Sequence, residues 1–147
     1  MTIIQRSAIV PHTAEEMYKL VNAIEDYPDF VPWCKQTVVH SRDEDEIHAT
    51  LSFEGGGFNK SFTTCNRLQK NKMIEMRLID GPFKHLEGFW RFEHHEDTHC
   101  MVKLDLEFEL ANKILGMAFG AVFNQVANSL VDAFSKRASE VYGNNQS

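Results

Sequence analysis

The strongest constraint on the fold is a change of hydrophobic periodicity near Asn112. In residues 101–110 apolar residues alternate with charged ones, which is typical of an antiparallel strand with one buried face. In residues 113–142 apolar residues recur every three or four positions without a proline, which predicts a long amphipathic helix. A sheet with one apolar face must cover that face, and this helix is the element long enough to do so.

The N-terminal segment predicts one strand and two short helices. Residues 3–10 are mostly β-branched or apolar and are followed by a proline, so they are expected to form the first strand. Thr13 and Glu16 have the spacing of a capping box, which predicts a helix over 14–22. The next block, 26–34, contains two prolines, so only a short helical turn is expected there.

The middle of the chain predicts an antiparallel meander. Runs of alternating or β-branched residues are separated by charged or glycine-containing turns, and short connections favour antiparallel neighbours. We therefore predict an α+β domain in which a curved antiparallel sheet of about seven strands surrounds the long C-terminal helix. It is expected to span residues 1–143, with a flexible tail at 144–147. The strands expected in the meander are 37–41, 47–53, 58–68, 73–79, 84–93 and 101–110.

Charge, cysteine content and hydropathy narrow the function classes. The formal net charge of −6 argues against general DNA or RNA binding, because affinity for phosphate depends on lysine and arginine contacts. Cys34, Cys65 and Cys100 are odd in number and far apart, which fits reduced thiols in the cytoplasm. The N-terminus lacks the pattern of a signal peptide, and no apolar run approaches the roughly 20 residues of a membrane span. We therefore expect a cytoplasmic protein that could still contact a membrane surface.

Residues that could carry catalysis or bind a metal form no recognisable set. His94, His95 and His99 could present imidazoles together, and histidine is a common zinc ligand. Their position at a predicted polar turn also fits a solvated hairpin. The sequence has no glycine-flanked nucleophilic serine and no phosphate-binding glycine loop, and Cys34 is expected to be a buried, inert thiol. We expect no catalytic residues, no metal site and no required cofactor.

The interior is expected to be unusually aromatic, because the chain has 11 phenylalanines and 6 methionines. This composition predicts either a packed core or a cavity for an apolar ligand. Gly116 and Gly120 near the start of the long helix allow either close packing on the sheet or a wider cavity mouth. In the second case, the N-terminal half of the helix and block 26–34 would form the portal. The candidate ligand-binding residues are Tyr27, Phe30, Trp33, Trp90, Leu104, Leu106, Phe108, Gly116, Phe119, Gly120 and Phe123.

Sequence blocks spread over almost the whole chain resemble one known family. The most specific are Tyr-Pro-x-Phe-x-Pro at 27–32 and Asp-Gly-Pro-Phe at 80–83. The other blocks are 7–11, 14–18, 20–22, 33–34, 60–64, Lys84, Leu86 with Gly88 and Trp90, 105–108 and 112–113. Together they resemble the START-like helix-grip superfamily, also called the birch-pollen-allergen (Bet v 1-like) fold. Within it they resemble the polyketide-cyclase branch, which contains coenzyme Q-binding proteins and bacterial ribosome association toxins.

This resemblance implies a helix-grip fold and a binding protein rather than an enzyme. Relatives in the branch are associated with ubiquinone and respiration, so ubiquinone or a related lipid is the expected ligand. Transient contact with the inner membrane surface would accompany that role. Bacterial members are also described as binding the large ribosomal subunit and blocking its joining to the small one, so this subunit is the alternative partner.

Overall fold

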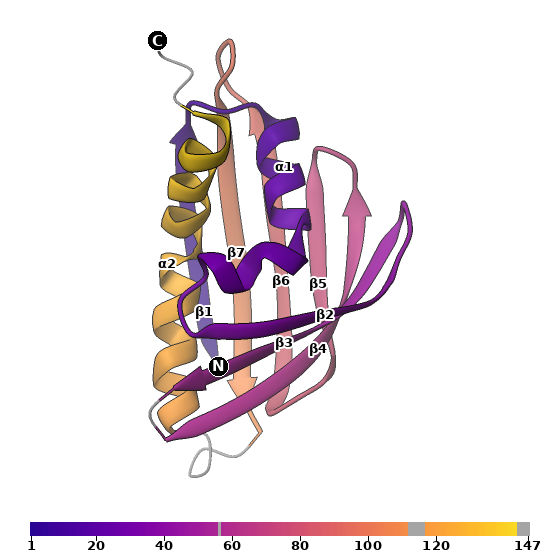
Figure 1. Ribbon diagram of the computed structural model, residues 1–147, viewed down its shortest axis with the longest axis vertical. Helices are drawn as coiled ribbons and strands as arrows, with labels where there is room; N and C mark the ends of the chain where they lie inside the picture. The colour runs from indigo at the N-terminus through magenta and orange to yellow at the C-terminus, as the bar shows by residue number, and fades with distance from the viewer. Residues whose placement is uncertain (56, 112–116, 144–147) are drawn as a thin grey trace.

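The computed structural model describes residues 1–55, 57–111 and 117–143, and its elements follow the predicted order (Figure 1). One strand and two short helices precede six strands and a long C-terminal helix, so the α+β class is confirmed. The elements are β1 (Thr2–Val10), α1 (Ala14–Asn22), η1 (Ile24–Asp29), β2 (Cys34–Arg42), β3 (Glu46–Gly55), β4 (Phe58–Gln69), β5 (Met73–Asp80), β6 (Phe83–His94), β7 (Cys100–Leu110) and α2 (Met117–Tyr142).

The described strands form one antiparallel, seven-stranded sheet in the order β1-β7-β6-β5-β4-β3-β2. Strands β2 to β7 pair with their neighbours in sequence, and β1 pairs along its length with β7, from Thr2 opposite Phe108 to Val10 opposite Cys100. Figure 1 shows β2, β3 and β4 turned across the other strands, so the sheet is strongly curved. Helix α2 contacts β1, β4, β7 and α1, which is the expected helix-grip arrangement.

Helix α1 begins with the capping box that the sequence predicts. The backbone N–H of Glu16 donates to Oγ1 of Thr13 at 3.1 Å, and the backbone N–H of Thr13 donates to Oε1 of Glu16 at 2.9 Å. Two otherwise unpaired amides at the helix start are thereby satisfied. Further along the helix, Met17, Leu20 and Val21 are buried, so α1 packs on the rest of the domain through its apolar face.

Strand β7 has the alternation expected of a half-buried strand. Val102 and Leu104 are fully buried, and the charged residues between the apolar ones lie on the other face. Strand β2, in contrast, begins earlier than the predicted 37–41, because backbone pairing with β3 already starts with Cys34 opposite Phe53. The polar side chains in this stretch gave no alternation from which the pairing could be recognised.

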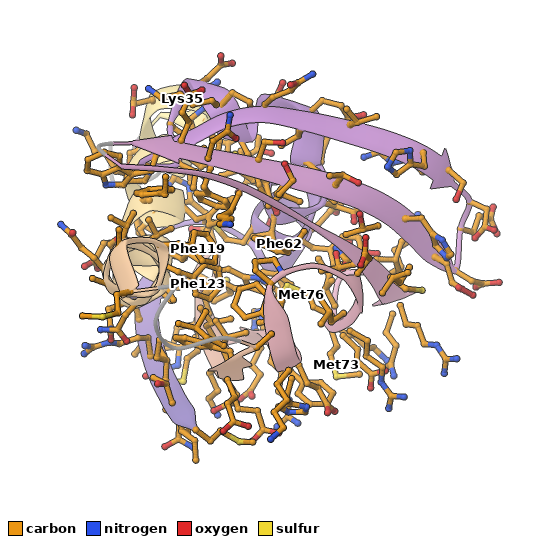
Figure 2. The ribbon with its side chains drawn as sticks, turned by 90° about the horizontal axis from the view of Figure 1, so that it is seen from below. Lys35, Phe62, Met73, Met76, Phe119 and Phe123 are labelled. Carbon is orange, nitrogen blue, oxygen red and sulfur yellow. The ribbon has the colours of Figure 1, made fainter. Side chains whose placement is uncertain are left out.

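The interface between the start of α2 and the sheet is packed with phenylalanine rings. We refer to Phe83, Phe108, Phe119 and Phe123 as the aromatic cluster. The ring centroid of Phe123 lies 4.8 Å from that of Phe108 and 5.0 Å from that of Phe83. Edge-to-face pairs of this kind contribute about 0.5–1.5 kcal/mol each beyond their buried area. Phe119 and Phe123 point from α2 into the interior (Figure 2), so this part of the interior is a packed core.

Gly120 lies where α2 packs against Leu110 at the end of β7. A Cβ atom added to it would lie only 2.5 Å from Cδ1 of Leu110. The missing side chain therefore lets the helix lie directly on the strand, as expected for close packing. Gly116 and the predicted tail 144–147 lie outside the described residues. In the described ranges no helix is both long and apolar enough to span a membrane.

Candidate functional site

A cavity of about 80 Å³ lies between the inner face of the sheet and α2, beside the aromatic cluster. Strands β3 to β7 form one wall, and α2 and η1 form the other. The lining is apolar except for Thr64 and Asn66 on β4 and the hydroxyl of Tyr27. The lining residues are Ile24, Tyr27, Val31, Leu51, Phe53, Phe62, Thr64, Asn66, Met76, Leu86, Trp90, Leu106, Phe123, Val126, Ala127, Leu130 and Phe134.

Four of the predicted ligand-binding residues lie in the wall of this cavity. They are Tyr27 from η1, Trp90 from β6, Leu106 from β7 and Phe123 from α2. These side chains come from segments far apart in the sequence, and the curvature of the sheet brings them together. Their role in binding a ligand remains a prediction.

Six other predicted residues lie outside the lining of this cavity. Leu104 is fully buried in the core, and Phe30 packs on Phe134 with a ring-centroid distance of 5.1 Å. Alternation placed the strand residues on the correct face, but it cannot show which part of that face borders a cavity. The six residues are Phe30, Trp33, Leu104, Phe108, Phe119 and Gly120.

Sequence reasoning missed the contribution of β4 to the cavity. Phe62, Thr64 and Asn66 share the inner face of this strand, since they occupy alternate positions. Met76 on β5 and Phe53 on β3 lie beside them in the lining. The alternation along β4 could have identified its inner face. Two of the three lining residues on this strand are polar, however, and the candidate ligand-binding residues were chosen for apolar or aromatic character.

The cavity is small relative to the ligands that the family resemblance implies. At about 80 Å³ it is smaller than the roughly 150 Å³ apolar cavity known to accept benzene. Aromatic and aliphatic side chains fill most of the remaining interior. A quinone ring with a tail can therefore enter only if side chains or α2 move away from the sheet.

The polar groups of the cavity are uncharged. Thr64 and Asn66 are 5% and 7% exposed, and the Thr64 hydroxyl donates to Oδ1 of Asn66 at 3.0 Å. The Tyr27 hydroxyl donates to the backbone oxygen of Val21. Burial raises the pKa of Tyr27, so its hydroxyl stays protonated. Tyr27 is the one residue with an ionisable side chain in the lining that the structure describes.

A chain of aromatic rings connects the surface to the cavity. Trp33 is 39% exposed, and its φ of 67° turns the backbone so that its ring lies against Gly55. The ring of Phe58 lies 6.2 Å from Trp33 and 5.9 Å from Phe119. Phe119 in turn lies 5.6 Å from Phe123 in the cavity wall. The proline-rich block and the start of α2 are therefore joined by continuous aromatic contacts, which places the predicted portal segments together.

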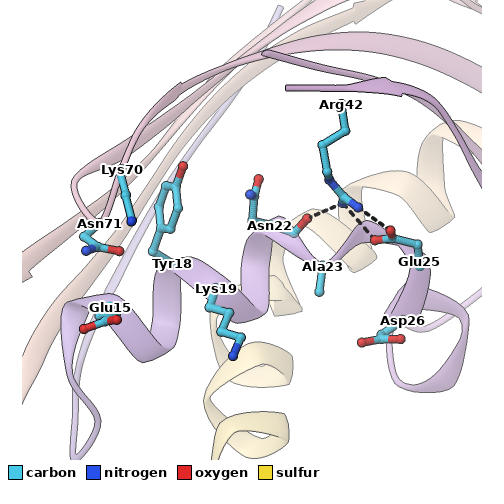
Figure 3. A pocket seen from close by; sticks show the side chains of 10 residues that line it. All are labelled: Glu15, Tyr18, Lys19, Asn22, Ala23, Glu25, Asp26, Arg42, Lys70 and Asn71. Atoms are coloured by element: carbon cyan, nitrogen blue, oxygen red, sulfur yellow. Dashed lines mark hydrogen bonds and ion pairs between the residues drawn. The ribbon is translucent and has the colours of Figure 1, made fainter. Parts of the chain in front are cut away.

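An open cleft of about 550 Å³ lies beside α1, and it shares no lining residue with the cavity (Figure 3). Arg42 donates hydrogen bonds to the Glu25 carboxylate and, at 3.0 Å, to the backbone oxygen of Asn22. The hydrogen bond from Arg42 lowers the pKa of Glu25. The cation is thus already paired, and the cleft offers no excess charge for an ionic ligand. Its charged side chains are Glu15, Glu25 and Asp26 against Lys19, Arg42 and Lys70.

The buried cysteines are poorly suited to nucleophilic chemistry. Cys34 and Cys100 are both buried, as expected for Cys34 from the sequence. Burial raises the pKa of each thiol to about 11, so both are thiols rather than thiolates near neutral pH. Neither cysteine lines the cavity.

The predicted histidine turn forms a closed hairpin. The backbone N–H of His95 donates to the backbone oxygen of His99 at 3.1 Å, and the backbone N–H of His99 donates to the backbone oxygen of Glu96 at 2.7 Å. In the described part of the chain, the groups with metal-ligand spacing lie elsewhere, on the outer face of the sheet, and are partly exposed. In one of them, Nε2 of His85 lies 3.0 Å from Oε1 of Glu107, within hydrogen-bond distance. These groups are Glu46 with His48 and Cys65, and His85 with Glu87 and Glu107.

The chain is similar to curated proteins along nearly its full length. It is 42% identical to the ribosome association toxin RatA of Escherichia coli K12 over 142 residues, covering 97% of this chain and 90% of that protein. It is 41% identical to RatA of Vibrio cholerae O1 over 143 residues, covering 97% and 99%. It is 24% identical to the mitochondrial coenzyme Q-binding protein COQ10 of Dictyostelium discoideum, covering 92% and 68%.

Solved structures share the fold at lower identity. A START superfamily protein from Mycobacterium smegmatis superposes with a TM-score of 0.78 at 19% identity, covering 95% of this chain and 98% of that one. The Zhui aromatase/cyclase from a Streptomyces species superposes with a TM-score of 0.75 at 15% identity, covering 94% of this chain and 93% of that one. The same fold therefore carries proteins with different names and activities. The family model described as polyketide cyclase/dehydrase and lipid transport matches residues 10–135, and the chain belongs to this family, with a START-like helix-grip fold.

Proposed function

We propose that this chain is a non-enzymatic protein that binds a hydrophobic small molecule between the sheet and α2. Ubiquinone or a related lipid is the ligand class, and the role is to support respiratory electron transport. The observation that carries the proposal is the cavity between the sheet and α2, whose lining, among the described residues, contains no charged side chain. The family description, which includes lipid transport, and the name of the coenzyme Q-binding relative agree with it.

The energetics favour a ligand with a long apolar part. An isoprenoid tail that buries about 400 Å² of apolar surface gains on the order of 10 kcal/mol before the costs of association. Part of this gain must offset the displacement of packed side chains, because the cavity alone is too small for a tail. The aromatic path from Trp33 to Phe123 offers continuous apolar contact along the way.

The cavity chemistry supports binding rather than catalysis. A general acid or base must reach the reacting proton with a suitable pKa. Tyr27 is the ionisable group in the described lining, its hydroxyl is bound to a backbone oxygen, and burial raises its pKa. The lining therefore supplies apolar contact surface and three neutral polar side chains, those of Tyr27, Thr64 and Asn66.

A bound ligand tests the proposal directly. Protein purified under native conditions from a quinone-replete host is analysed by native mass spectrometry, and its solvent extract is analysed for quinones and lipids. We expect a bound hydrophobic molecule that Ala127→Leu reduces strongly, because the larger side chain would fill the cavity. Ala121→Leu, on the exposed face of the same helix, is the matched control. Empty wild-type protein that also takes up no added quinone would contradict the proposal.

A second candidate function is association with the large ribosomal subunit in the cytoplasm. It is favoured by identities of 41% and 42% to proteins named ribosome association toxin, each over 97% of this chain. Because the chain carries a net charge of −6, contact through a ribosomal protein fits better than contact through RNA phosphates. Co-sedimentation with purified subunits at low salt tests it. Absence from the large-subunit fraction would remove this candidate, whereas Ala127→Leu should leave such binding intact.

A further inference from the structure

Two polar side chains stand on the otherwise apolar inner face of β4. Thr64 and Asn66 are more than nine-tenths buried and line the cavity. Their cross-strand neighbours on β3, Ala49 and Ile47, are fully buried, and Met76 lies opposite Asn66 on β5. Burying an amide among apolar groups is costly unless its hydrogen bonds are made. The partners of this pair therefore matter for both stability and binding.

The hydrogen bonds inside the pair leave the amide nitrogen available. An asparagine side chain has two N–H donors and a carbonyl acceptor, and threonine has one hydroxyl donor. The Thr64 hydroxyl uses its proton on Oδ1 of Asn66, at 3.0 Å. Within the described residues, no hydrogen bond uses either proton of the Asn66 amide nitrogen. The pair is thus a donor site in the wall of a mostly apolar cavity.

Other hydroxyl pairs in this part of the sheet lie on its outer face. Thr50 and Thr63 are joined at 2.7 Å, and Ser52 and Ser61 are joined at 2.7 Å. In each of these pairs one hydroxyl can donate to the other, and solvent can satisfy the remaining groups. The inner pair is more than nine-tenths buried, so solvent reaches it far less than it reaches the outer pairs.

We infer that Thr64 and Asn66 recognise a neutral oxygen acceptor at the polar end of the ligand, such as a quinone or ketone carbonyl. The inference rests on the proposed function and specifies which end of the ligand reaches β4. A carboxylate is disfavoured, because the described lining holds no cation to pair with it and burying an unpaired charge is costly. Thr64 holds the amide oxygen, so that the amide N–H groups face the incoming carbonyl.

The test compares ligands with and without the carbonyl oxygen. The probes are a benzoquinone with a decyl tail, decylbenzene and decanoate, each titrated into the full-length protein. Asn66→Leu keeps the size of the side chain but removes the donors. It should weaken binding of the quinone about tenfold, the effect expected of one hydrogen bond, while decylbenzene binding stays unchanged or improves. Decanoate should bind more weakly than the quinone.

Two further measurements separate recognition from folding. Thr63→Val removes an outer hydroxyl from the same strand and should leave binding of every probe unchanged. The infrared carbonyl stretch of the bound quinone should lie at lower frequency in wild type than in Asn66→Leu. Thr64→Val, which keeps the shape of the side chain, should reproduce part of the loss.

Three outcomes would overturn the inference. Equal loss for the quinone and decylbenzene in Asn66→Leu would show a packing role instead of recognition. Unchanged quinone affinity and carbonyl frequency would show that buried water satisfies the pair. If wild type binds none of the three probes, the proposed function itself fails, and the inference fails with it.

Discussion

Two stretches of α2 meet the same sheet and differ in how completely side chains fill the space between them. At the first turns of the helix, Gly120 lies directly against Leu110, and the aromatic cluster packs ring against ring. One to three turns further along, Ala127 and the inner face of β4 leave a cavity of about 80 Å³ that contains a buried polar pair. The first stretch is filled by side chains, whereas the second is filled incompletely, and it is there that the proposed function places the ligand.

The largest effect should come from truncating the packed stretch. Phe119→Ala removes a ring that is 1% exposed and should lower the free energy of unfolding by about 3–5 kcal/mol. Leu130→Ala in the cavity wall should lower it by only about 1–2 kcal/mol, since Leu130 is partly exposed and already borders empty space. Urea unfolding of both variants measures the difference. Equal losses would mean that the two stretches are equally well packed.

Enlarging one buried alanine at a time sharpens the comparison. Ala127 and Ala138 lie on the same helix and are 1% and 0% exposed, but only Ala127 lines the cavity. Ala138→Leu should destabilise the protein by about 1–3 kcal/mol through overpacking. Ala127→Leu should stay within about 1 kcal/mol of wild type, because the added carbons occupy the cavity. Thermal unfolding distinguishes the two, and the reverse order would contradict the position of the cavity.

A smaller, pH-dependent effect is expected at the far end of α2. His12 is fully buried, with its Nε2 3.4 Å from Oγ of Ser139 and its ring beside Tyr142. Burial lowers the pKa of His12; Glu16 opposes this shift and His99 adds to it. As the pH falls below about 6.5, the unfolded chain takes up a proton first, so stability decreases until the lower folded pKa is reached.

The contribution of His12 to the slope of the free energy of unfolding against pH cannot exceed about 1.4 kcal/mol per pH unit. Unfolding free energies of wild type and His12→Gln, measured between neutral and mildly acidic pH, isolate its contribution. The wild-type profile should fall more steeply on the acid side. Parallel profiles would show that protonation of His12 is not coupled to folding.

The elements that could be predicted from sequence are those whose signal is local. The capping box of Thr13 and Glu16 marks the start of α1, because both partners lie within one helical turn. The alternation in β7 marks its buried face, because every second residue is charged. Such patterns determine the direction of a side chain without reference to the rest of the fold.

The cavity could be predicted only in part, because it depends on long-range packing. Leu104 and Leu106 share one face of β7, yet only Leu106 lines the cavity, whereas Leu104 is fully buried in the core. The difference depends on the side chains from other elements that pack on each leucine. Thr64 and Asn66 were missed because polarity usually marks an outer face. Trp33 was expected in the lining, but its positive φ turns the ring onto Gly55 at the surface.

The central claim is that the cavity lined by Trp90 binds a hydrophobic ligand. Trp33→Phe leaves Trp90 as the sole tryptophan, and a quinone that enters the cavity should quench its fluorescence. Titration of this variant with the decyl-substituted benzoquinone should give saturable quenching that disappears when Ala127→Leu is added. Quenching that never saturates, or that is the same in the filled variant, would contradict the account.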